Sequence, residues 1–309
     1  MISVVCAVRD LSEENVVIKN LGKNKPGQVV FVEGKSPSLQ RNAGVKQALG
    51  SIIYFIDDDS VIPPGILERA EIFFEAHPEA AVLGGPELTP DTDSILQKSF
   101  GAVFSSPFAA GRSSFRYARG GALRESSEKE LILCNMFIRK EVFEELKGFD
   151  ERLYPNEENE FLSRVKDAGM KIYHDPDIFI YRSKRKDYQG FIKQCFNYGR
   201  GRTEQSFVNF TLSGLVNFIP AFFLVYLISE IMTLGMDLVP LAFYVMADIF
   251  FSVKAGLSLK NSRIAMLSMF NFFVLHVIYG AGTLFGFITA FTIKERVIDT
   301  DIRVKVTVP

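Results

Sequence analysis

The sequence has no tryptophan, and only three cysteines and three histidines among its 309 residues. The cysteines, Cys6, Cys134 and Cys195, lie far apart, with no Cys-x-x-Cys pair and no histidine at ligand spacing. This pattern excludes a disulfide framework and a cysteine–histidine zinc site. We expect three buried thiols in a reducing compartment.

The sequence also lacks a recognisable signal peptide and a large net charge. The run Met1–Val5 leads directly into a predicted strand, without a basic flank, a long apolar stretch or a cleavage site, so we expect no segment to be removed. The formal net charge of −1 excludes a globally basic protein of the kind that binds nucleic acid.

Charge is scarce in one part of the chain, residues 207–293, which contain only six Asp, Glu, Lys or Arg residues. Three apolar segments lie there: Leu212–Leu234, Leu238–Val253 and Ile264–Ile293. The first is long enough to span about 30 Å of hydrocarbon. The third would measure about 45 Å as one helix, so we expect it to tilt, protrude or break near its glycines, Gly280, Gly282 and Gly286. For the second, a buried core helix is the alternative to a membrane span.

These segments predict three parts: a soluble domain over residues 1–206, a transmembrane region of two to four segments over 207–293, and a short charged tail over 294–309. Seven basic residues lie between Arg182 and Arg202 with one acid, Asp187. A basic segment before an apolar one favours the cytoplasmic face of the cell membrane, and a solvated basic loop is the alternative.

The number of membrane crossings stays open in the sequence. Three crossings from the cytoplasm would place the tail outside. The tail, however, carries basic residues that favour the inside, namely Lys294, Arg296, Arg303 and Lys305. A re-entrant segment or an interfacial helix would remove the conflict.

The first 181 residues alternate between apolar runs and polar, helix-compatible segments. The runs Ile2–Val8, Val29–Val32 and Ile52–Ile56 are continuously apolar, which is typical of parallel strands covered by helices on both faces. The other expected elements are the helices Glu13–Leu21, Ser38–Leu49, Gly65–His77, Lys140–Leu146 and Glu158–Ala168 and the strands Ala81–Leu83, Lys171–Tyr173 and Ile178–Tyr181. The segment Thr89–Ser127 has little periodicity, and we expect a loop-rich functional cover. The pattern predicts an α/β fold.

Charged residues follow each of the first three strands: Arg9 and Asp10, then Glu33, then Asp57, Asp58 and Asp59. Because ligands in such sheets bind beyond the carboxyl ends of the strands, we expect these ends to meet at one crevice. Adjacent carboxylates repel one another unless a cation holds them, and Mg²⁺ or Mn²⁺ bridging a diphosphate fits. An acidic turn before Pro63 is the alternative.

A second acidic cluster comprises Glu157, Glu158 and Glu160 at the start of a predicted helix. Acids in a first helical turn are favoured by the helix dipole, which is the structural alternative to a catalytic role. Two acidic clusters, one for a metal and one for proton abstraction, are what sugar transfer to a hydroxyl requires.

The chain resembles the inverting family 2 glycosyltransferases in a series of motifs over about residues 1–205. In chain order, these are Arg9-Asp10, Arg41-Asn42-Ala43-Gly44, Phe55-Ile56-Asp57-Asp58-Asp59, Cys134-Asn135-Met136-Phe137-Ile138-Arg139, Gly148-Phe149-Asp150-Glu151 and Asn156-Glu157-Glu158-Asn159-Glu160. The apolar region, with Tyr198-Gly199-Arg200-Gly201-Arg202, is similar to the membrane-anchored members that build surface polysaccharides. The pattern is most similar to succinoglycan-type transferases.

This resemblance implies a GT-A fold, a mixed sheet flanked by helices, and a nucleotide-diphospho-sugar donor. It implies that Asp57 and Asp59 bind the metal and that Glu158 is the catalytic base, with Glu157 and then Glu160 as alternatives. Arg9, Asp10, Glu33, Arg41 and Asp58 are assigned to the donor nucleotide.

The resemblance further implies a lipid-linked or glycan acceptor at the membrane. The Gln-x-x-Arg-Trp element of processive synthases is missing after Gln194, which favours single-sugar transfer. Two alternatives are a polyprenyl-phosphate glycosyltransferase and a non-catalytic scaffold that binds sugar nucleotides.

Overall fold

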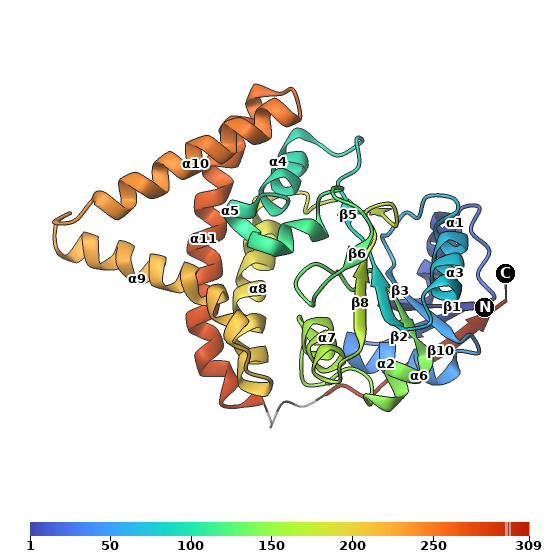
Figure 1. Cartoon of the computed structure of the whole chain (residues 1–309). Helices are drawn as coiled ribbons and strands as arrows, with labels where there is room; N and C mark the ends of the chain where they lie inside the picture. The colour runs from blue at the N-terminus through green and yellow to red at the C-terminus, as the bar shows by residue number, and fades with distance from the viewer. Residues whose placement is uncertain (294–295, 297, 309) are drawn as a thin grey trace. The chain divides into compact units, whose positions relative to one another are not determined.

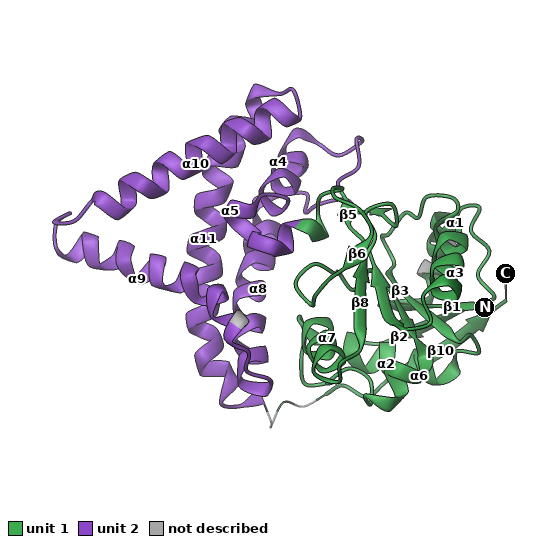
Figure 2. Ribbon diagram, viewed as in Figure 1, with its two compact units in different colours: residues 1–88, 115–182, 296–309 green, residues 89–114, 183–295 purple. Residues whose placement is uncertain are grey.

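The computed structural model describes residues 1–293, 296 and 298–308, so the predicted tail residue Lys294 lies outside the described part. By packing, the chain divides into two compact units (Figure 2). Unit 1 comprises residues 1–88, 115–182 and 296–309, and unit 2 comprises residues 89–114 and 183–295. The expected boundary at residue 206, between a soluble domain and a transmembrane region, is a division by function and stays a prediction.

Unit 1 is built around a mixed sheet. Within the described residues the strand order is β10-β2-β1-β3-β7-β4-β8-β6. The strands are β1 (Ile2–Val8), β2 (Gln28–Glu33), β3 (Ile52–Asp57), β4 (Ala80–Gly84), β6 (Arg124–Glu125), β7 (Asn135–Arg139), β8 (Lys171–His174) and β10 (Arg303–Thr307). A small second sheet pairs β5 (Glu87–Leu88) with β9 (Ile180–Tyr181).

Helices cover this sheet (Figure 1). They are α1 (Glu14–Leu21), α2 (Pro37–Gln47), α3 (Ile66–Ala76), α6 (Lys140–Glu145) and α7 (Glu157–Asp167). Successive residues of β1 enter opposite cores: Val4 and Cys6 pack in one apolar cluster and Val5 in the other. Burial on both faces explains why the strands are continuously apolar.

Four strands of unit 1 were not expected: the two-residue strands β5 and β6, and the longer β7 and β10. β7 runs antiparallel between β3 and β4, so the sheet is mixed. β10, from the predicted tail, pairs antiparallel with β2 from Arg303 opposite Glu33 to Thr307 opposite Val29. The tail is therefore the edge strand of the sheet. The three predicted thiols, Cys6, Cys134 and Cys195, are buried and free.

Unit 2 is helical. It contains α4 (Ile95–Phe104), α5 (Pro107–Ala110), α8 (Tyr188–Val208), α9 (Ile219–Met232), α10 (Val239–Ser258) and α11 (Ser262–Ala290), with a 3-10 helix, η3 (Leu212–Phe218), before α9. The expectation of a loop-rich Thr89–Ser127 is wrong over α4, which begins with a capping box between Ser94 and Gln97. Among the described residues, three helical segments are long and apolar enough to cross a membrane: Gly214–Met232, Val239–Ser258 and Ser262–Ala290.

The helix α11 is unbroken through its glycines, so of the three alternatives, tilting, protruding or breaking, the break does not occur. These glycines lie where other backbones approach closely. A Cβ atom on Gly282 would stand 2.1 Å from the Phe196 carbonyl oxygen of α8, and one on Gly280 would stand 2.3 Å from the Pro220 carbonyl oxygen of α9. The glycines thus serve helix packing.

Candidate active site

The carboxyl ends of β1, β2 and β3 meet at one edge of the sheet, as predicted. Val8 is paired with Glu33, and Ala7 with Asp57. Arg9 and Asp10 are exposed just beyond β1. Asp10 Oδ1 accepts a hydrogen bond from the Ser12 amide at 2.9 Å, and this bond lowers the pKa of Asp10. Asp10 thus caps the short 3-10 helix Leu11–Glu13 at this edge.

Glu33, the predicted nucleotide contact, is held by two groups. Its Oε2 accepts from the Leu11 amide at 3.1 Å, and its Oε1 is paired with Arg303 of β10. The tail strand therefore contributes a partner, Arg303, to the charged residues that follow β1, β2 and β3. We call these residues the strand-end cluster: Arg9, Asp10, Glu33, Asp57, Asp58 and Asp59. The sequence analysis missed this contribution because it did not predict β10.

Arg41 lies between the two acidic clusters. Its Nη2 is 3.0 Å from Asp57 Oδ1, and its Nη1 is 2.7 Å from Glu157 Oε1. Burial lowers the pKa of Arg41, but Asp57 and Glu157 outweigh this effect and raise it above the usual value. Gly44 lets α2 approach the sheet, because a Cβ there would stand 2.5 Å from a Val5 methyl carbon. One buried guanidinium thus joins Asp57 of the strand-end cluster to Glu157 of the acidic cluster at the start of α7.

Arg182 was counted in the basic segment expected at the cytoplasmic face of the membrane, with a solvated loop as the alternative, but acids hold it instead. Its guanidinium contacts Asp57 Oδ2 at 3.0 Å, Asp59 Oδ1 at 2.6 Å and Glu87 Oε2 at 3.4 Å. Burial lowers the pKa of Arg182, while these carboxylates raise it to well above the usual value. Burial raises the pKa of Asp59, although its side chain is half-exposed and Arg182 opposes the shift.

The predicted metal ligands are therefore held by a cation of the protein. Across residues 1–293, 296 and 298–308, no group of three or more His, Cys, Asp or Glu side chains is arranged to hold a metal ion. Asp57 and Asp59 nevertheless offer carboxylate oxygens, and Mg²⁺ is commonly held by one or two carboxylates together with substrate phosphates. The donor chemistry fits such an ion, which would share the carboxylates of Asp57 and Asp59 with Arg182 or displace it.

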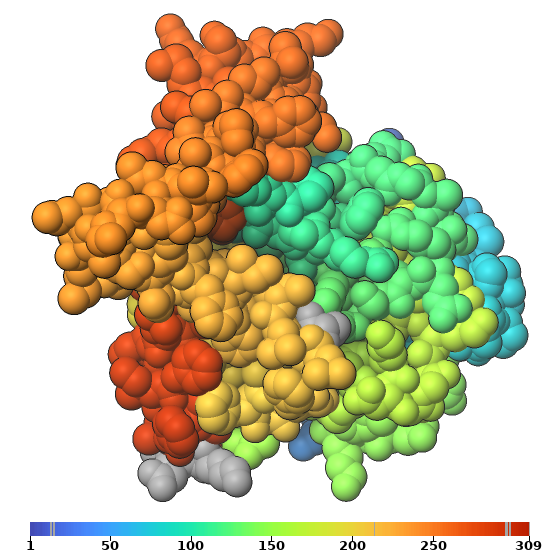
Figure 3. Space-filling model, turned by 60° about the vertical axis from the view of Figure 1, so that its left-hand side comes forward, coloured from blue at the N-terminus to red at the C-terminus, as the bar shows by residue number. Residues whose placement is uncertain are grey.

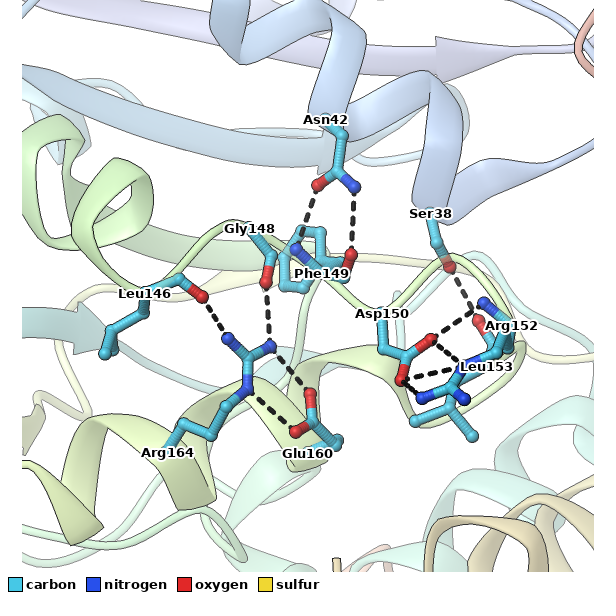
Figure 4. Close-up of polar contacts among 10 residues, drawn as sticks. All are labelled: Ser38, Asn42, Leu146, Gly148, Phe149, Asp150, Arg152, Leu153, Glu160 and Arg164. Atoms are coloured by element: carbon cyan, nitrogen blue, oxygen red, sulfur yellow. Dashed lines mark hydrogen bonds and ion pairs between the residues drawn. The ribbon is translucent and has the colours of Figure 1, made fainter. Parts of the chain in front are cut away.

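The loop before α7 fixes the second cluster in place (Figure 4). The Asn42 side chain accepts from the Phe149 amide and donates to the Phe149 carbonyl, each at 2.9 Å. Ser38 donates to the Leu153 carbonyl at 2.6 Å. Gly148 has φ +67°, and a Cβ there would stand 2.7 Å from Asn42 Oδ1. Because Asn42 and Ser38 lie on α2 with Arg41, the loop and α7 are aligned with that arginine.

The three acids of α7 have different surroundings. Both oxygens of Glu160 are paired with Arg164, which also donates to the Leu146 and Gly148 carbonyls. Glu157 is paired with Arg41, and burial raises the pKa of Glu157 to about 7. Glu158 lies 3.4 Å from Arg116 Nη1.

Exposure separates the acids further. The Glu158 side chain is 11% exposed, against 3% for Glu157 and 6% for Glu160. Arg116 was not identified from the sequence. It comes from the segment expected to be loop, and it donates to the Glu128 and Lys129 carbonyls as well as to Asn159. Arg116 is one of several arginines in this segment, with Arg112 and Arg119 close by, so the sequence does not single it out for this role.

A family model described as "Glycosyl transferase family group 2" matches residues 52–285. This match spans well over half of the chain. The chain belongs to this glycosyltransferase family. The match covers Asp57, Arg182 and the acids of α7, and it continues through most of the apolar helices.

Solved structures are similar to this glycosyltransferase, and the first named here, at a TM-score above 0.5, supports its fold. One is the mannosyltransferase PcManGT from Pyrobaculum calidifontis in complex with GDP-Man and Mn²⁺, with 11% identity, a TM-score of 0.57, and coverage of 92% of this chain and 86% of that one. Another is S. aureus TarS 1-349 in complex with UDP-GlcNAc, with 16% identity, a TM-score of 0.46, and coverage of 98% and 96%. No curated protein matches the chain in sequence. The fold of this glycosyltransferase is GT-A, with a mixed sheet flanked by helices.

Proposed function

We propose that this glycosyltransferase moves a sugar from a nucleotide-diphosphate donor to a lipid-linked acceptor in surface glycan assembly, with inversion at the anomeric carbon. We place the catalytic site on the cytoplasmic side of the cell membrane. The apolar helices of unit 2 support a membrane location, and a lipid-linked acceptor would be available there. Basic residues of α8, such as Arg200 and Arg202, support the cytoplasmic side.

One observation carries the catalytic part of the proposal: Arg41 joins Asp57 of the strand-end cluster to Glu157 of α7. This link fixes the distance between the side that would bind the leaving diphosphate and the side that would bind the acceptor. Proximity and orientation of this kind account for a large part of enzymatic rate enhancement.

Glu158 is the proposed general base. It is the most exposed of the three acids, whereas Glu157 is occupied by Arg41 and Glu160 by Arg164. Glu158 would take the proton of the acceptor hydroxyl as the hydroxyl oxygen attacks the anomeric carbon opposite the leaving nucleotide. Arg116 would orient Glu158, and Glu157 would hold Arg41 against Asp57.

Asp57 and Asp59 are the residues that would hold Mg²⁺ or Mn²⁺. When bound, the ion supplies positive charge to the leaving diphosphate. Arg9, Asp10, Glu33 and Asp58 are proposed to contact the donor, since they share the strand-end edge. Arg41 is proposed to position the two clusters.

The acceptor is either a lipid-linked glycan or polyprenyl phosphate itself, and the apolar helices are compatible with both. The products differ in chemistry. A sugar joined directly to polyprenyl phosphate is released by mild acid, whereas an ordinary glycosidic bond between two sugars resists it. Because mild acid also releases a glycan that is joined to polyprenyl through phosphate, the size of the released product distinguishes the acceptors: a single sugar indicates polyprenyl phosphate and an oligosaccharide indicates a lipid-linked glycan.

The test is donor binding and transfer by the full chain in detergent. Residues 1–206 alone would lack the edge strand β10. We expect one of UDP, GDP or their sugar conjugates to bind with Mn²⁺, and binding to be lost with chelator and in Asp59→Ala. Binding that withstands both changes would contradict the metal site. Binding without transfer to any lipid acceptor would support a scaffold instead.

The assignment of the base is tested by three matched variants, Glu157→Gln, Glu158→Gln and Glu160→Gln. We expect Glu158→Gln to keep donor binding and to lose the most turnover, about 10²- to 10⁴-fold, because removing a general base has an effect of this order. A larger loss of turnover in either of the other two variants, with donor binding intact, would reassign the base.

A further inference from the structure

The two ends of unit 2 connect to the same sheet. Residues up to Arg182 belong to unit 1, and so do residues from Arg296 onward. The strand β10 pairs with β2 over the five residues Arg303–Thr307. Backbone hydrogen bonds between strands require the strands to lie about 5 Å apart, so both strands are on one side of any membrane. Residues 183–295 therefore cross a bilayer an even number of times, and three crossings are excluded.

The helix α11 is the candidate that does not cross. It packs along α8, and backbone contacts fix the two helices against each other. A Cβ on Gly199 of α8 would stand 2.1 Å from the Tyr279 carbonyl oxygen, and one on Gly286 of α11 would stand 2.8 Å from the Arg200 carbonyl oxygen. Thr289 donates to the buried Glu204 of α8 at 2.7 Å.

These contacts set the depth of α11 in the membrane. The helix α8 carries Lys193, Arg200, Arg202 and Glu204 and does not qualify as a span. If α11 crossed the hydrocarbon, its contacts would take the charged residues of α8 with it, which is unfavourable. The helix α11 is also the most buried of the three candidates, since 39% of its most apolar 18-residue stretch is buried. A position at the membrane interface agrees with both observations.

The other two candidates form a hairpin. Only 6% of the most apolar 18-residue stretch is buried in Gly214–Met232, and 17% in Val239–Ser258. Residues 233–238 join the two segments. In Figure 1, α9 and α10 leave α8 and α11 and meet at a tip, and Figure 3 shows their side chains, in orange, on the surface of the unit. Large apolar side chains are exposed along both helices, among them Phe222 at 73%, Phe243 at 64% and Phe250 at 63%. Spans of 19 and 20 residues suit a hydrocarbon layer of about 30 Å.

We propose that the chain crosses the bilayer twice, as the α9–α10 hairpin, and that α11 lies in the interface on the side of the catalytic sheet. The occupant of the exposed apolar surface is the lipid bilayer. This inference rests on the membrane location in the proposed function. It resolves the conflict over the tail, because residues 298–308 then lie on the side of the active site and the tip, residues 233–238, lies on the opposite side.

The test is labelling of single introduced cysteines with a membrane-impermeant maleimide, in intact cells and after permeabilisation. The native cysteines are buried, so the parent chain should not be labelled and serves as the negative control. Met236→Cys reports the tip, Lys260→Cys the turn between α10 and α11, and Val308→Cys the tail. Leu49→Cys, 75% exposed in unit 1, reports the side of the catalytic sheet.

We expect Met236→Cys to be labelled from one side and the other three from the opposite side. Labelling of Met236→Cys from the side of Leu49→Cys would contradict a crossing hairpin. Labelling of Lys260→Cys from the side of the tip would mean that α11 crosses, and would overturn the proposal. Sugar transfer measured in the same membranes tests the proposed function separately, because the labelling pattern does not depend on turnover.

Discussion

Glu157 and Glu158 are neighbours in sequence but differ in partner and burial. Glu157 is fully enclosed and paired with Arg41, and Glu158 is the more exposed and lies near Arg116. The sequence predicted that the acids of this helix start form a functional cluster. The resemblance ranked them by position alone, because their partners, Arg41 and Arg116, are distant in sequence and could not be predicted.

The raised pKa of Glu157 gives a prediction about pH. An acid whose pKa is about 7 in the folded chain, against an ordinary value of 4.5, binds more protons when folded than when unfolded between these values. Its contribution to stability is therefore full below about pH 4.5 and is lost as the pH rises to 7. We expect the unfolding midpoint to fall over this range, and the fall to be smaller in Glu157→Gln.

Thermal unfolding of the full chain in detergent at pH 5, 6, 7 and 8 measures this difference. Glu160→Gln is the control, since it removes a carboxylate of the same helix that is paired with Arg164 instead of Arg41. Parallel curves for the parent chain and Glu157→Gln would contradict the prediction.

Arg182 gives a prediction about metal binding. It occupies one oxygen each of Asp57 and Asp59, so a divalent ion must compete with it. We expect Arg182→Ala to lower the melting temperature without metal, because three carboxylates lose their shared cation, and to increase the shift caused by Mn²⁺. Arg119→Ala, whose guanidinium pairs with Asp177 at 2.6 Å, is the control. An Mn²⁺ shift that is unchanged in Arg182→Ala would show that Arg182 does not compete with the ion.

At the scale of elements, the buried strands and most helices were predictable. The continuous apolar runs predicted β1, β2 and β3, and the structure confirms them. β10 was missed although Val304 and Val306 alternate with Arg303 and Lys305, because five residues in a charged tail also fit a loop. The helix α4 was missed because its apolar residues were read within a longer unperiodic segment. In both cases a distant partner stabilises the element, β2 for β10 and α11 for α4, where Asn271 donates to Ser99 at 2.8 Å.

The packing of α11 on α8 gives a prediction at this scale. Gly282→Ala would place a methyl group against the Phe196 carbonyl oxygen, which cannot move without shifting α8. Overpacking of this kind costs about 1–3 kcal/mol, so we expect a lower melting temperature in detergent. Gly190→Ala in α8 is the control, because its nearest neighbours are side-chain atoms at 3.2 Å or more. Equal melting temperatures for the two variants would contradict close packing at Gly282.

At the scale of the whole molecule, the sequence predicted a soluble part followed by an apolar part. Packing divides the chain differently, since residues 89–114 belong with the apolar helices and residues 296–309 with the sheet. Composition is compared between consecutive stretches of sequence, so it cannot reveal a unit that is assembled from separate segments. Arg182 shows the same limit for the site. Its place in a basic run suggested a segment at the membrane face or a solvated loop, whereas three acids from β3, the turn after it and β5 contact Arg182.

The pairing of β10 with β2 also sets an order of events during biosynthesis. The strand β10 follows α9, α10 and α11 in the sequence, so it is synthesised after them. Until β10 has been synthesised, the edge of β2 carries unpaired backbone groups and Glu33 lacks its partner Arg303. A nascent or prematurely terminated chain thus exposes an edge prone to aggregation. The sheet is completed only after the apolar helices have been synthesised.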